Sequence, residues 1–323
     1  MNGIWVFCEM TDSGPRGVVY ELIGEAARLN AAFGLGGVTA VMMCGTTDRL
    51  ARELCAVGAD HVLAAEATVS RGPTDEQGCA IELAALAGQF KPEIILVGAT
   101  AFGRSMAPRA AARMRTGLTA DCTRLDIDPN SGLLLQTRPA FGGNLLATII
   151  CPTARSQMAT VRPKVFPHPM LDYSRPVSVQ STKLSGYVSP IKVIEQLTSA
   201  TSININDYDI LVAVGQGICG ARNIALAQTL AERLGGTFAA SRPVVDAGLI
   251  PYARQVGQTG KSVAPKLYIA LGISGAIQHM AAVSAETLVA VNTDSSADIF
   301  GYADYGLVMD CEAFLTQCLD YLG

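Results

Sequence analysis

The sequence predicts an α/β protein of two domains, each with a mostly parallel Rossmann-like sheet flanked by helices, the first extended by antiparallel strands. The chain has 323 residues, which is more than one ordinary domain needs. Short apolar runs alternate with helical stretches over the first ninety residues, and a similar alternation begins again near residue 209. Such an alternation is typical of parallel strands covered by helices. We expect an N-terminal domain at residues 1–190 and a C-terminal domain at residues 205–323.

The first domain opens in strand–helix order. Between Tyr20 and Ala32 apolar residues recur at helical spacing, whereas Val38 begins an apolar run of the kind found in buried strands. The helix expected at 106–114 has Ser105 directly before it as a candidate N-cap. These patterns predict strands at 4–8, 38–44, 61–63 and 93–97, and helices at 18–33, 48–57, 77–90 and 106–114.

Consecutive strands are expected next, because apolar runs are separated by glycine and proline turns. The residues at 138–144 suit either an anion-binding loop or a hairpin turn, and the hairpin is the better interpretation. Prolines between 163 and 176, followed by a more polar stretch to about residue 207, predict a link between the domains. The expected strands lie at 118–127, 133–137, 145–150 and 158–161.

The second domain begins with an apolar strand, three closely spaced glycines and a helix. Further apolar runs alternate with helical stretches to the end of the sequence. This pattern predicts strands at 209–214, 238–240, 267–271 and 288–291, and helices at 221–234, 276–283 and 312–321.

Composition excludes several classes of function. Lys plus Arg is 24 against 28 Asp plus Glu, a net charge of -4, so no basic surface for nucleic acid or anionic lipid is expected. The longest apolar stretch, 145–151, is far shorter than the ~20 residues of a membrane-spanning helix, and no secretory signal is recognisable, so we expect a cytoplasmic protein. Nine cysteines without a C-x-x-C pair and three scattered histidines argue against disulfides and metal sites.

Two glycine-rich turns could bind phosphate. Residues 215–220 match G-x-G-x-x-G between a strand and a helix, although a tight turn that needs small residues explains them equally well. After the strand at 267–271, Ser274 is placed to cap a helix, and Gly272 and Gly275 would let a ligand approach the backbone. Two such turns in one domain suggest a bound nucleotide.

Arg242 follows a predicted strand. In open α/β sheets, ligands bind at the carboxyl ends of the strands. An ordinary surface ion pair is an equally good interpretation of this arginine. The donor-rich turn 256–261 also suits a flavin or nucleotide pocket. No G-x-S-x-G sequence or P-loop is present, which disfavours a hydrolase or a kinase and leaves redox chemistry through an organic cofactor.

At these residues the chain resembles the alpha subunit of electron transfer flavoprotein, and the resemblance covers nearly the whole sequence. The segments that carry it are GATAFGRSMAPRAAARMRTGLTADCTRLDID (98–128), QTRPAFGGNLLATIICP (136–152), QMATVRPKVF (157–166), SRPVVDAG (241–248), QVGQTGK (255–261), LYIALGISGAIQH (267–279) and ADYGLVMD (303–310).

The resemblance implies a heterodimer with a beta subunit, which the first domain would contact, and an FAD held by the second domain. AMP or a second FAD would be bound mainly by the beta subunit. Electrons would pass from a flavoprotein dehydrogenase, such as an acyl-CoA dehydrogenase of fatty acid beta-oxidation, to a quinone reductase or to ferredoxin or flavodoxin. The assembly would be a simple carrier or part of a flavin-based electron-bifurcating complex, without small-molecule turnover by this chain. The alternatives are a flavin-free scaffold subunit and an NAD-dependent dehydrogenase.

The resemblance also implies roles for individual residues. Arg242 would favour electron uptake by the flavin, Thr259 would lie near its N5 atom and His279 near its pyrimidine edge. The FAD-contacting positions would be Ser241, Arg242, Val256, Gly257, Gln258, Thr259, Ser274, Gly275, Ala276, Ile277, Gln278, His279, Asn292 and Asp310.

The chain departs from the family pattern at two of these turns. Gln216 lies between two glycines where many relatives carry arginine, so a cation expected near the phosphates is missing. Lys261 is a candidate replacement for that charge. Asp298 replaces a proline that is usual before Ile299, which would loosen the turn. We therefore expect weaker binding of FAD than in those relatives.

Overall fold

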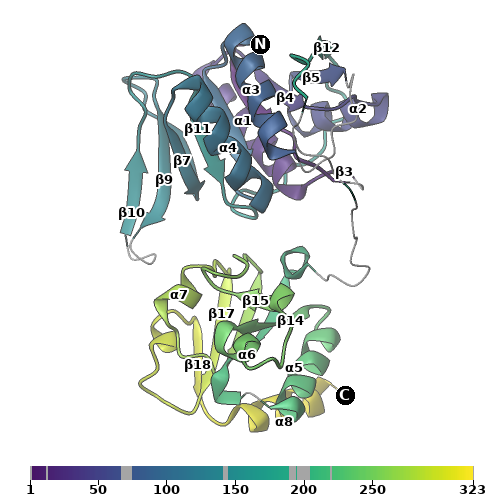
Figure 1. Ribbon diagram of the computed structural model, residues 1–323. Coiled ribbons are helices and arrows are strands. Elements are labelled where there is room, and N and C mark those ends of the chain that lie inside the picture. The colour runs from purple at the N-terminus through teal and green to yellow at the C-terminus, as the bar shows by residue number, and fades with distance from the viewer. Residues whose placement is uncertain are drawn as a thin grey trace. The chain divides into compact units, whose positions relative to one another are not determined.

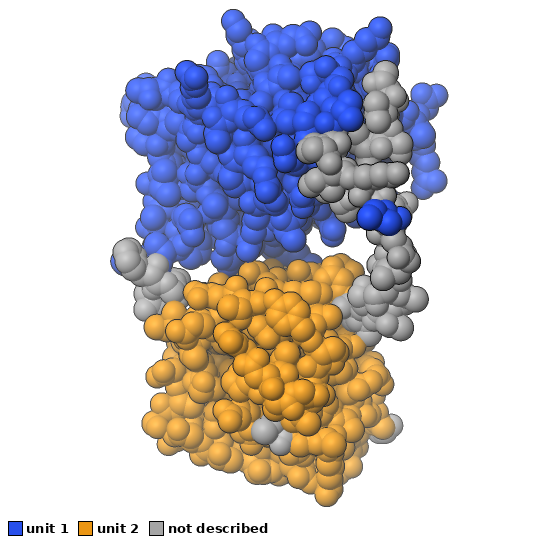
Figure 2. Space-filling view, viewed as in Figure 1, with its two compact units in different colours: residues 1–140, 145–196 blue, residues 141–144, 197–323 orange. Residues whose placement is uncertain are grey.

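The computed structural model describes residues 2–11, 14–66, 75–140, 145–188, 194, 204–218 and 220–322. The chain divides into two compact units, shown in different colours in Figure 2. The first is formed by residues 1–140 and 145–196, and the second includes residues 197–323. Both units are α/β, as the sequence predicts, and Figure 1 labels many of their elements.

A seven-stranded parallel sheet forms the centre of the first unit, with strand order β12-β5-β4-β1-β6-β11-β7. Alternate side chains of β1 face opposite sides: Ile4 and Val6 pack with α1 and α2, whereas Trp5 and Phe7 pack with α3 and α4. The elements are β1 Ile4–Phe7, β4 Val38–Met42, β5 His61–Glu66, β6 Ile94–Gly98, β7 Leu118–Cys122, β11 Gln157–Val161, β12 Val179–Lys183, α1 Gly17–Phe33, α2 Asp48–Val57, α3 Glu76–Phe90 and α4 Ala101–Met114.

The strands after α4 do not all join an antiparallel extension. The expected strand at 118–127 is two strands, because Asp121 has a left-handed backbone (φ 62°) and the β7–β11 register shifts beside it. β7 and β11 belong to the parallel sheet. The antiparallel sheet contains β8 Arg124–Ile127, β9 Leu134–Ala140 and β10 Leu145–Ile149.

The pairing of β9 and β10 supports the hairpin interpretation of 138–144. Leu145 pairs with Ala140, so the strands are joined by a four-residue connection, residues 141–144, which lie outside the described residues. A short antiparallel pair near the N-terminus, β2 Met10–Thr11 and β3 Gly14–Pro15, had no sequence signal.

Two sequence-based predictions for the first unit are wrong. Helix α4 begins at Ala101, and its cap is Thr100, whose hydroxyl accepts the N–H of Gly103 at 2.9 Å; Ser105 lies inside the helix. The region from 163 to 207 is not only a link, because β12 within it extends the sheet by pairing with β5. β12 is almost wholly exposed and polar, so it carries no apolar pattern that would reveal a strand.

The second unit has a six-stranded parallel sheet in the order β15-β14-β13-β16-β17-β18. Ile269 and Leu271 of β16 pack with α5 and α8 on one face, whereas Tyr268 and Ala270 pack with α7 and η5 on the other. The strands are β13 Ile210–Val214, β14 Thr237–Ser241, β15 Gln255–Val256, β16 Leu267–Leu271, β17 Thr287–Asn292 and β18 Tyr305–Val308. The helices are α5 Ala221–Arg233, α6 Arg242–Asp246, α7 Ile277–Met280 and α8 Cys311–Leu322, with short 3-10 turns η2 Ile205–Asp207, η3 Gln216–Ile218, η4 Tyr252–Arg254 and η5 Asp298–Gly301.

In each parallel sheet, successive strands are first added on one side of a central strand and later on its other side. In the second unit the chain passes from β13 to β14 on one side and later returns to β16 on the other, so the switch point lies between β13 and β16. In the first unit the corresponding position lies between β1 and β6. There the buried carboxylate of Glu9 pairs with Arg16 and accepts a hydrogen bond from Thr100, which ties the two loops together.

Candidate functional site

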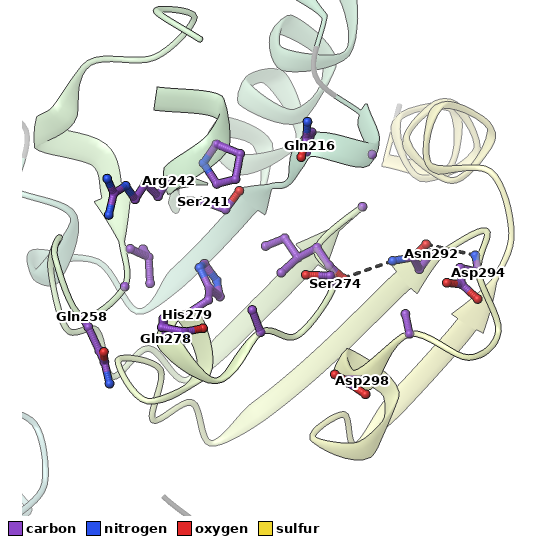
Figure 3. A pocket seen from close by; sticks show the side chains of 18 of the residues that line it. Gln216, Ser241, Arg242, Gln258, Ser274, Gln278, His279, Asn292, Asp294 and Asp298 are labelled. Carbon is purple, nitrogen blue, oxygen red and sulfur yellow. Dashed lines mark hydrogen bonds between the residues drawn. The ribbon is translucent and has the colours of Figure 1, made fainter. Parts of the chain in front are cut away.

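A cavity of about 700 Å³ lies at the carboxyl ends of the strands of the second unit, at its switch point (Figure 3). Ligands of open α/β sheets bind at such positions. Loops after five of the strands supply its walls: Gln216 and Gly217 after β13; Ser241, Arg242 and Pro243 after β14; Val256, Gly257, Gln258 and Thr259 from β15 onward; Gly272, Ile273, Ser274, Ala276, Gln278 and His279 after β16; and Asn292, Asp294, Ser296, Ala297 and Asp298 after β17.

Most of the residues expected to contact FAD come together in this cavity, although they come from distant parts of the sequence. The three residues expected to tune a flavin, Arg242, Thr259 and His279, all line it. The other expected residues that line it are Ser241, Val256, Gly257, Gln258, Ser274, Ala276, Gln278 and Asn292.

Three expected contact residues are not among those that line the cavity, and each has a structural explanation. A Cβ on Gly275 would lie 2.2 Å from the Ile299 nitrogen, and its φ is +90°, so glycine is needed for packing against η5. Asp310 caps α8, where its Oδ1 accepts the N–H of Ala313 at 2.9 Å. Ile277 begins α7 and is half exposed.

The glycines of the G-x-G-x-x-G turn pack against the neighbouring loop. A Cβ on Gly215 would lie 2.1 Å from the carbonyl oxygen of Gly272. The Gly217 N–H donates to the same oxygen at 3.1 Å, so that amide already has a partner within the protein. The tight-turn interpretation therefore accounts for both glycines.

The loop after β16 differs in one respect from the sequence-based expectation. Ser274 does not cap α7, because the N-cap position is Ala276 and no side chain accepts a hydrogen bond there. The Ser274 carbonyl instead accepts the N–H of Ile299 at 3.0 Å. Gly272 has φ +61°, a conformation that favours glycine.

One side-chain amide and one backbone hydrogen bond join the loops that form the walls of the cavity. Asn292 Nδ2 donates to the carbonyl of Ile273 at 3.1 Å, and its Oδ1 accepts the N–H of Asp294 at 3.0 Å. The Gln258 N–H donates to the carbonyl of Gln278 at 2.9 Å, which ties the loops after β15 and β16 together. These contacts fix the loops that carry the lining side chains.

Arg242 is the one arginine or lysine among the described residues that line the cavity. It begins α6, and its Nε lies 3.2 Å from Oδ2 of Asp246, with both side chains more than half exposed. Arg242 therefore makes a surface ion pair and also lines the cavity. Figure 3 shows Asp298 on the opposite side from Arg242, near Asp294, so the charge of the walls is divided between two ends.

The position of Lys261 does not support it as a replacement for the cation absent at Gln216. Its side chain is not among those that line the cavity, and its Nζ lies 3.3 Å from Oδ1 of Asn204. Gln216 itself does line the cavity.

His279 carries an unsatisfied polar atom in the wall. Its side chain is 7% exposed, its Nε2 lies 2.8 Å from the Tyr268 hydroxyl, and its buried Nδ1 has no hydrogen-bond partner among the described residues. Burial lowers the pKa of His279 to about 4, against a smaller upward effect of the Val256 backbone, so the ring is neutral at pH 7. A buried atom without a partner fits a site that is completed by a bound group.

Thr259 is held by its neighbours in the turn after β15. Its hydroxyl accepts a hydrogen bond from Nε2 of Gln255 at 3.0 Å, and its carbonyl accepts one from the hydroxyl of Tyr252. Gly257 has φ +144°, so the turn requires glycine at that position. The hydroxyl hydrogen of Thr259 remains available for an acceptor in the cavity.

Sequence reasoning missed part of the wall formed after β17. Asp294, Ser296 and Ala297 line the cavity but match no motif, and Asp298 stands out in the sequence only as a departure from the family pattern. The available signal was their position directly after a predicted buried strand. Pro243 and Ile273 could have been found in the same way, since each follows a strand of the same sheet.

The switch-point cavity, its glycine-lined walls and its amide and hydroxyl donors define an α/β protein that binds a nucleotide cofactor in its second unit. Residues 4–185 match the family described as the electron transfer flavoprotein domain, and residues 204–284 match the electron transfer flavoprotein FAD-binding domain. The chain belongs to the electron transfer flavoprotein alpha-subunit family, and its second unit is the FAD-binding domain.

Characterised relatives are similar over almost the full chain. The alpha subunit of electron transfer flavoprotein from Thermoanaerobacterium thermosaccharolyticum is 47% identical, over 95% of this chain and 93% of the relative. The acryloyl-CoA reductase electron transfer subunit beta of Anaerotignum propionicum is 39% identical, over 98% and 94%. Subunit LctC of the lactate dehydrogenase (NAD(+),ferredoxin) of Acetobacterium woodii is 38% identical, over 98% of this chain and 76% of the relative.

None of the helices in the described ranges is long and apolar enough to cross a membrane. Within the same ranges, no three His, Cys, Asp or Glu side chains are grouped so that they could hold a metal ion.

Proposed function

We propose that this chain holds FAD in the cavity of its second unit and carries electrons as one subunit of a heterodimer with a beta subunit. The observation that carries the proposal is the convergence of Arg242, Thr259 and His279 on one cavity, in the unit that matches the FAD-binding domain of the family. Bound FAD would supply the electron-transfer chemistry, and the side chains of this chain would bind it, orient it and set its electrostatic environment.

Arg242 is the residue that favours electron uptake. A guanidinium beside the redox-active ring stabilises added negative charge by on the order of one to four kcal/mol at a partly dry site. Its exposure and its ion pair with Asp246 place the expected effect at the low end of that range.

Neutral side chains would complete the contacts with the ring. The hydroxyl of Thr259 and the imidazole of His279 are candidates for hydrogen bonds to the flavin, and the amides of Gln258 and Gln278 for further ones. The Ser274 loop would approach the phosphates, and Asn292 the ribityl or adenosine portion. Three expected contact residues would support the site indirectly, by holding its loops in place and not by touching the cofactor: Gly275, Ile277 and Asp310.

The end of the cavity opposite Arg242 favours hydroxyl groups over phosphates. Asp294 and Asp298 are acceptors suited to ribose hydroxyls, and Gln216 brings no positive charge. This arrangement supports the expectation of a weaker hold on the cofactor's phosphates.

Gln216→Arg therefore tests the missing cation. We expect this variant to retain more FAD than the wild type during dialysis, by up to about tenfold in dissociation constant, since one added phosphate contact contributes on the order of 1 kcal/mol. Gln228→Arg, an exposed position on α5 that does not line the cavity, is the matched control. Equal retention by the wild type and both variants would show that Gln216 does not limit FAD binding.

The names of the relatives suggest partners for this chain. A flavoprotein dehydrogenase would donate or accept the electrons, as the electron transfer subunit of an acryloyl-CoA reductase suggests. The similarity to LctC supports a place in a bifurcating complex with ferredoxin, whereas simple carriers of beta-oxidation would pass electrons to a quinone reductase. The beta subunit would contact the first domain and hold AMP or a second FAD, and we propose a cytoplasmic location.

The flavin potential tests the role of Arg242. Arg242→Ala should lower the midpoint potential of the bound flavin by on the order of tens of millivolts, whereas Arg242→Lys, which keeps the charge, should lower it less. Arg222→Ala removes an arginine from an exposed ion pair with Glu312, away from the cavity, and is the control. An unchanged potential in Arg242→Ala, measured by dye-coupled titration, would remove Arg242 from this role.

A further inference from the structure

We propose that Tyr268 is a positioning residue that fixes the tautomer of His279, so that the imidazole keeps its proton on Nδ1 and offers that N–H to the bound cofactor. The inference rests on the proposed function, because it concerns how the same cavity presents a donor to a flavin. Tyr268 itself does not line the cavity.

Tyr268 holds His279 from the core of the unit. It is the second residue of β16, it is fully buried, and its side chain lies on the face of the sheet that also packs against Met280 and Ile299. Its hydroxyl lies 2.8 Å from Nε2 of His279. The ring nitrogen left for a ligand is therefore Nδ1.

The direction of this hydrogen bond follows from the number of donors and acceptors. Among the described residues His279 is the one hydrogen-bond partner of the Tyr268 hydroxyl. If Nε2 carried the proton, the hydroxyl would accept it, and the hydroxyl's own hydrogen would be buried without an acceptor, at a cost of about 1–3 kcal/mol. If the hydroxyl donates to Nε2, the proton of the neutral ring lies on Nδ1, and this N–H is the one group of the pair left without a partner among the described residues. The other tautomer leaves two such groups, the hydroxyl hydrogen and the lone pair of Nδ1, so the first is favoured.

Both groups are neutral when they make this contact at pH 7. Burial raises the pKa of Tyr268 and lowers that of His279 to about 4. A neutral imidazole carries a single N–H, so the tautomer decides whether Nδ1 is a donor or an acceptor.

The tautomer decides whether His279 stabilises or destabilises added negative charge on the cofactor. An N–H beside a flavin carbonyl or ring nitrogen stabilises added negative charge, whereas a bare ring nitrogen at the same place opposes it. Tyr268 would thus contribute to the flavin potential without touching the flavin.

The test is the tautomer of His279, read from ¹⁵N NMR of the imidazole in the full chain. The chain has three histidines, so comparison with His279→Gln assigns the signal. In the wild type we expect the proton on Nδ1. In Tyr268→Phe, which keeps the ring and removes the hydroxyl, we expect the ring to shift toward the Nε2–H tautomer. Tyr321→Phe, which removes a hydroxyl on an exposed side chain of α8 that does not line the cavity, should leave the signal unchanged.

A second readout is the flavin potential, which should fall in Tyr268→Phe and stay constant in Tyr321→Phe. A proton on Nε2 in the wild type would overturn the proposal, and this observation needs no variant to fold. An unchanged tautomer and potential in folded Tyr268→Phe would overturn it as well. The tautomer can be measured on flavin-free protein, so failure of the proposed electron-transfer function would show separately, as a chain that binds no flavin.

Discussion

His279 shows how burial gives one residue an effect on both chemistry and stability. Its imidazole is one of three in the chain and matches no metal motif, so the sequence offers only its position near a glycine-rich turn. In the structure it is buried in the cavity wall, and its pKa is lowered from 6.5 to about 4. The cavity wall therefore presents a neutral ring over the physiological range.

This lowered pKa predicts a pH dependence of stability. Below pH 6.5 the unfolded chain binds a proton at His279 that the folded chain does not bind until about pH 4. The stabilisation is complete above pH 6.5 and is lost as the pH falls to about 4, up to about 3 kcal/mol in all. The measurement is urea unfolding of flavin-free wild type and His279→Gln between pH 7 and pH 4. A constant difference between the two would contradict the assignment.

Asp246 gives a second prediction at the residue scale. Its carboxylate lies 3.2 Å from Nε of Arg242 and offsets part of the charge that the guanidinium presents to the cavity. Asp246→Asn should therefore raise the flavin midpoint potential, by less than Arg242→Ala lowers it, because both groups are solvent-exposed. Asp209→Asn, which breaks an exposed ion pair with Lys266, is the matched control. A lowered or unchanged potential in Asp246→Asn would refute the coupling.

At the scale of elements, the close approach of two loops sets the floor of the cavity. Gly215 after β13 meets the Gly272 carbonyl after β16 so closely that no side chain fits between them. The G-x-G sequence predicted a turn of this kind but did not reveal that protein backbone, and not phosphate, fills the space.

Gly215→Ala tests this contact. The added Cβ must displace the Gly272 loop, so we expect a loss of stability of about 1–3 kcal/mol or more, together with a lower FAD content. Gly220→Ala is the matched control, because a Cβ there meets nothing within 4 Å. The free energies of unfolding come from urea titration of both variants. Equal values would show that the loops can move apart without cost.

Buried elements could be predicted from the sequence, and exposed ones could not. The strands β1, β4, β6 and β16 are nearly fully buried and, apart from Thr39 in β4, apolar, so their composition alone marks them. β12 and β18 are largely exposed edge strands, and their pairing depends on neighbours far away in the sequence. The part of the site that sequence patterns missed, around Asp294, depends in the same way on the order of strands in the sheet.

At the scale of the whole molecule, the two units share a class of fold but treat their switch points differently. In the first unit Glu9, Arg16 and Thr100 tie the loops at this position together. In the second unit the loops leave a cavity of about 700 Å³, and the described part of its wall contains one arginine and the buried Nδ1 of His279. The cofactor role is accordingly assigned to the second unit.

The most direct test of this account is the number of cofactors released from the chain purified with its beta subunit. We predict bound FAD, with AMP in a simple carrier or a second FAD in a bifurcating assembly. Ala276→Phe, which puts a large side chain into the cavity, should remove one FAD per heterodimer and leave the beta subunit's nucleotide in place. Absence of flavin from the wild type after reconstitution with excess FAD, or an unchanged FAD count in Ala276→Phe, would contradict the account.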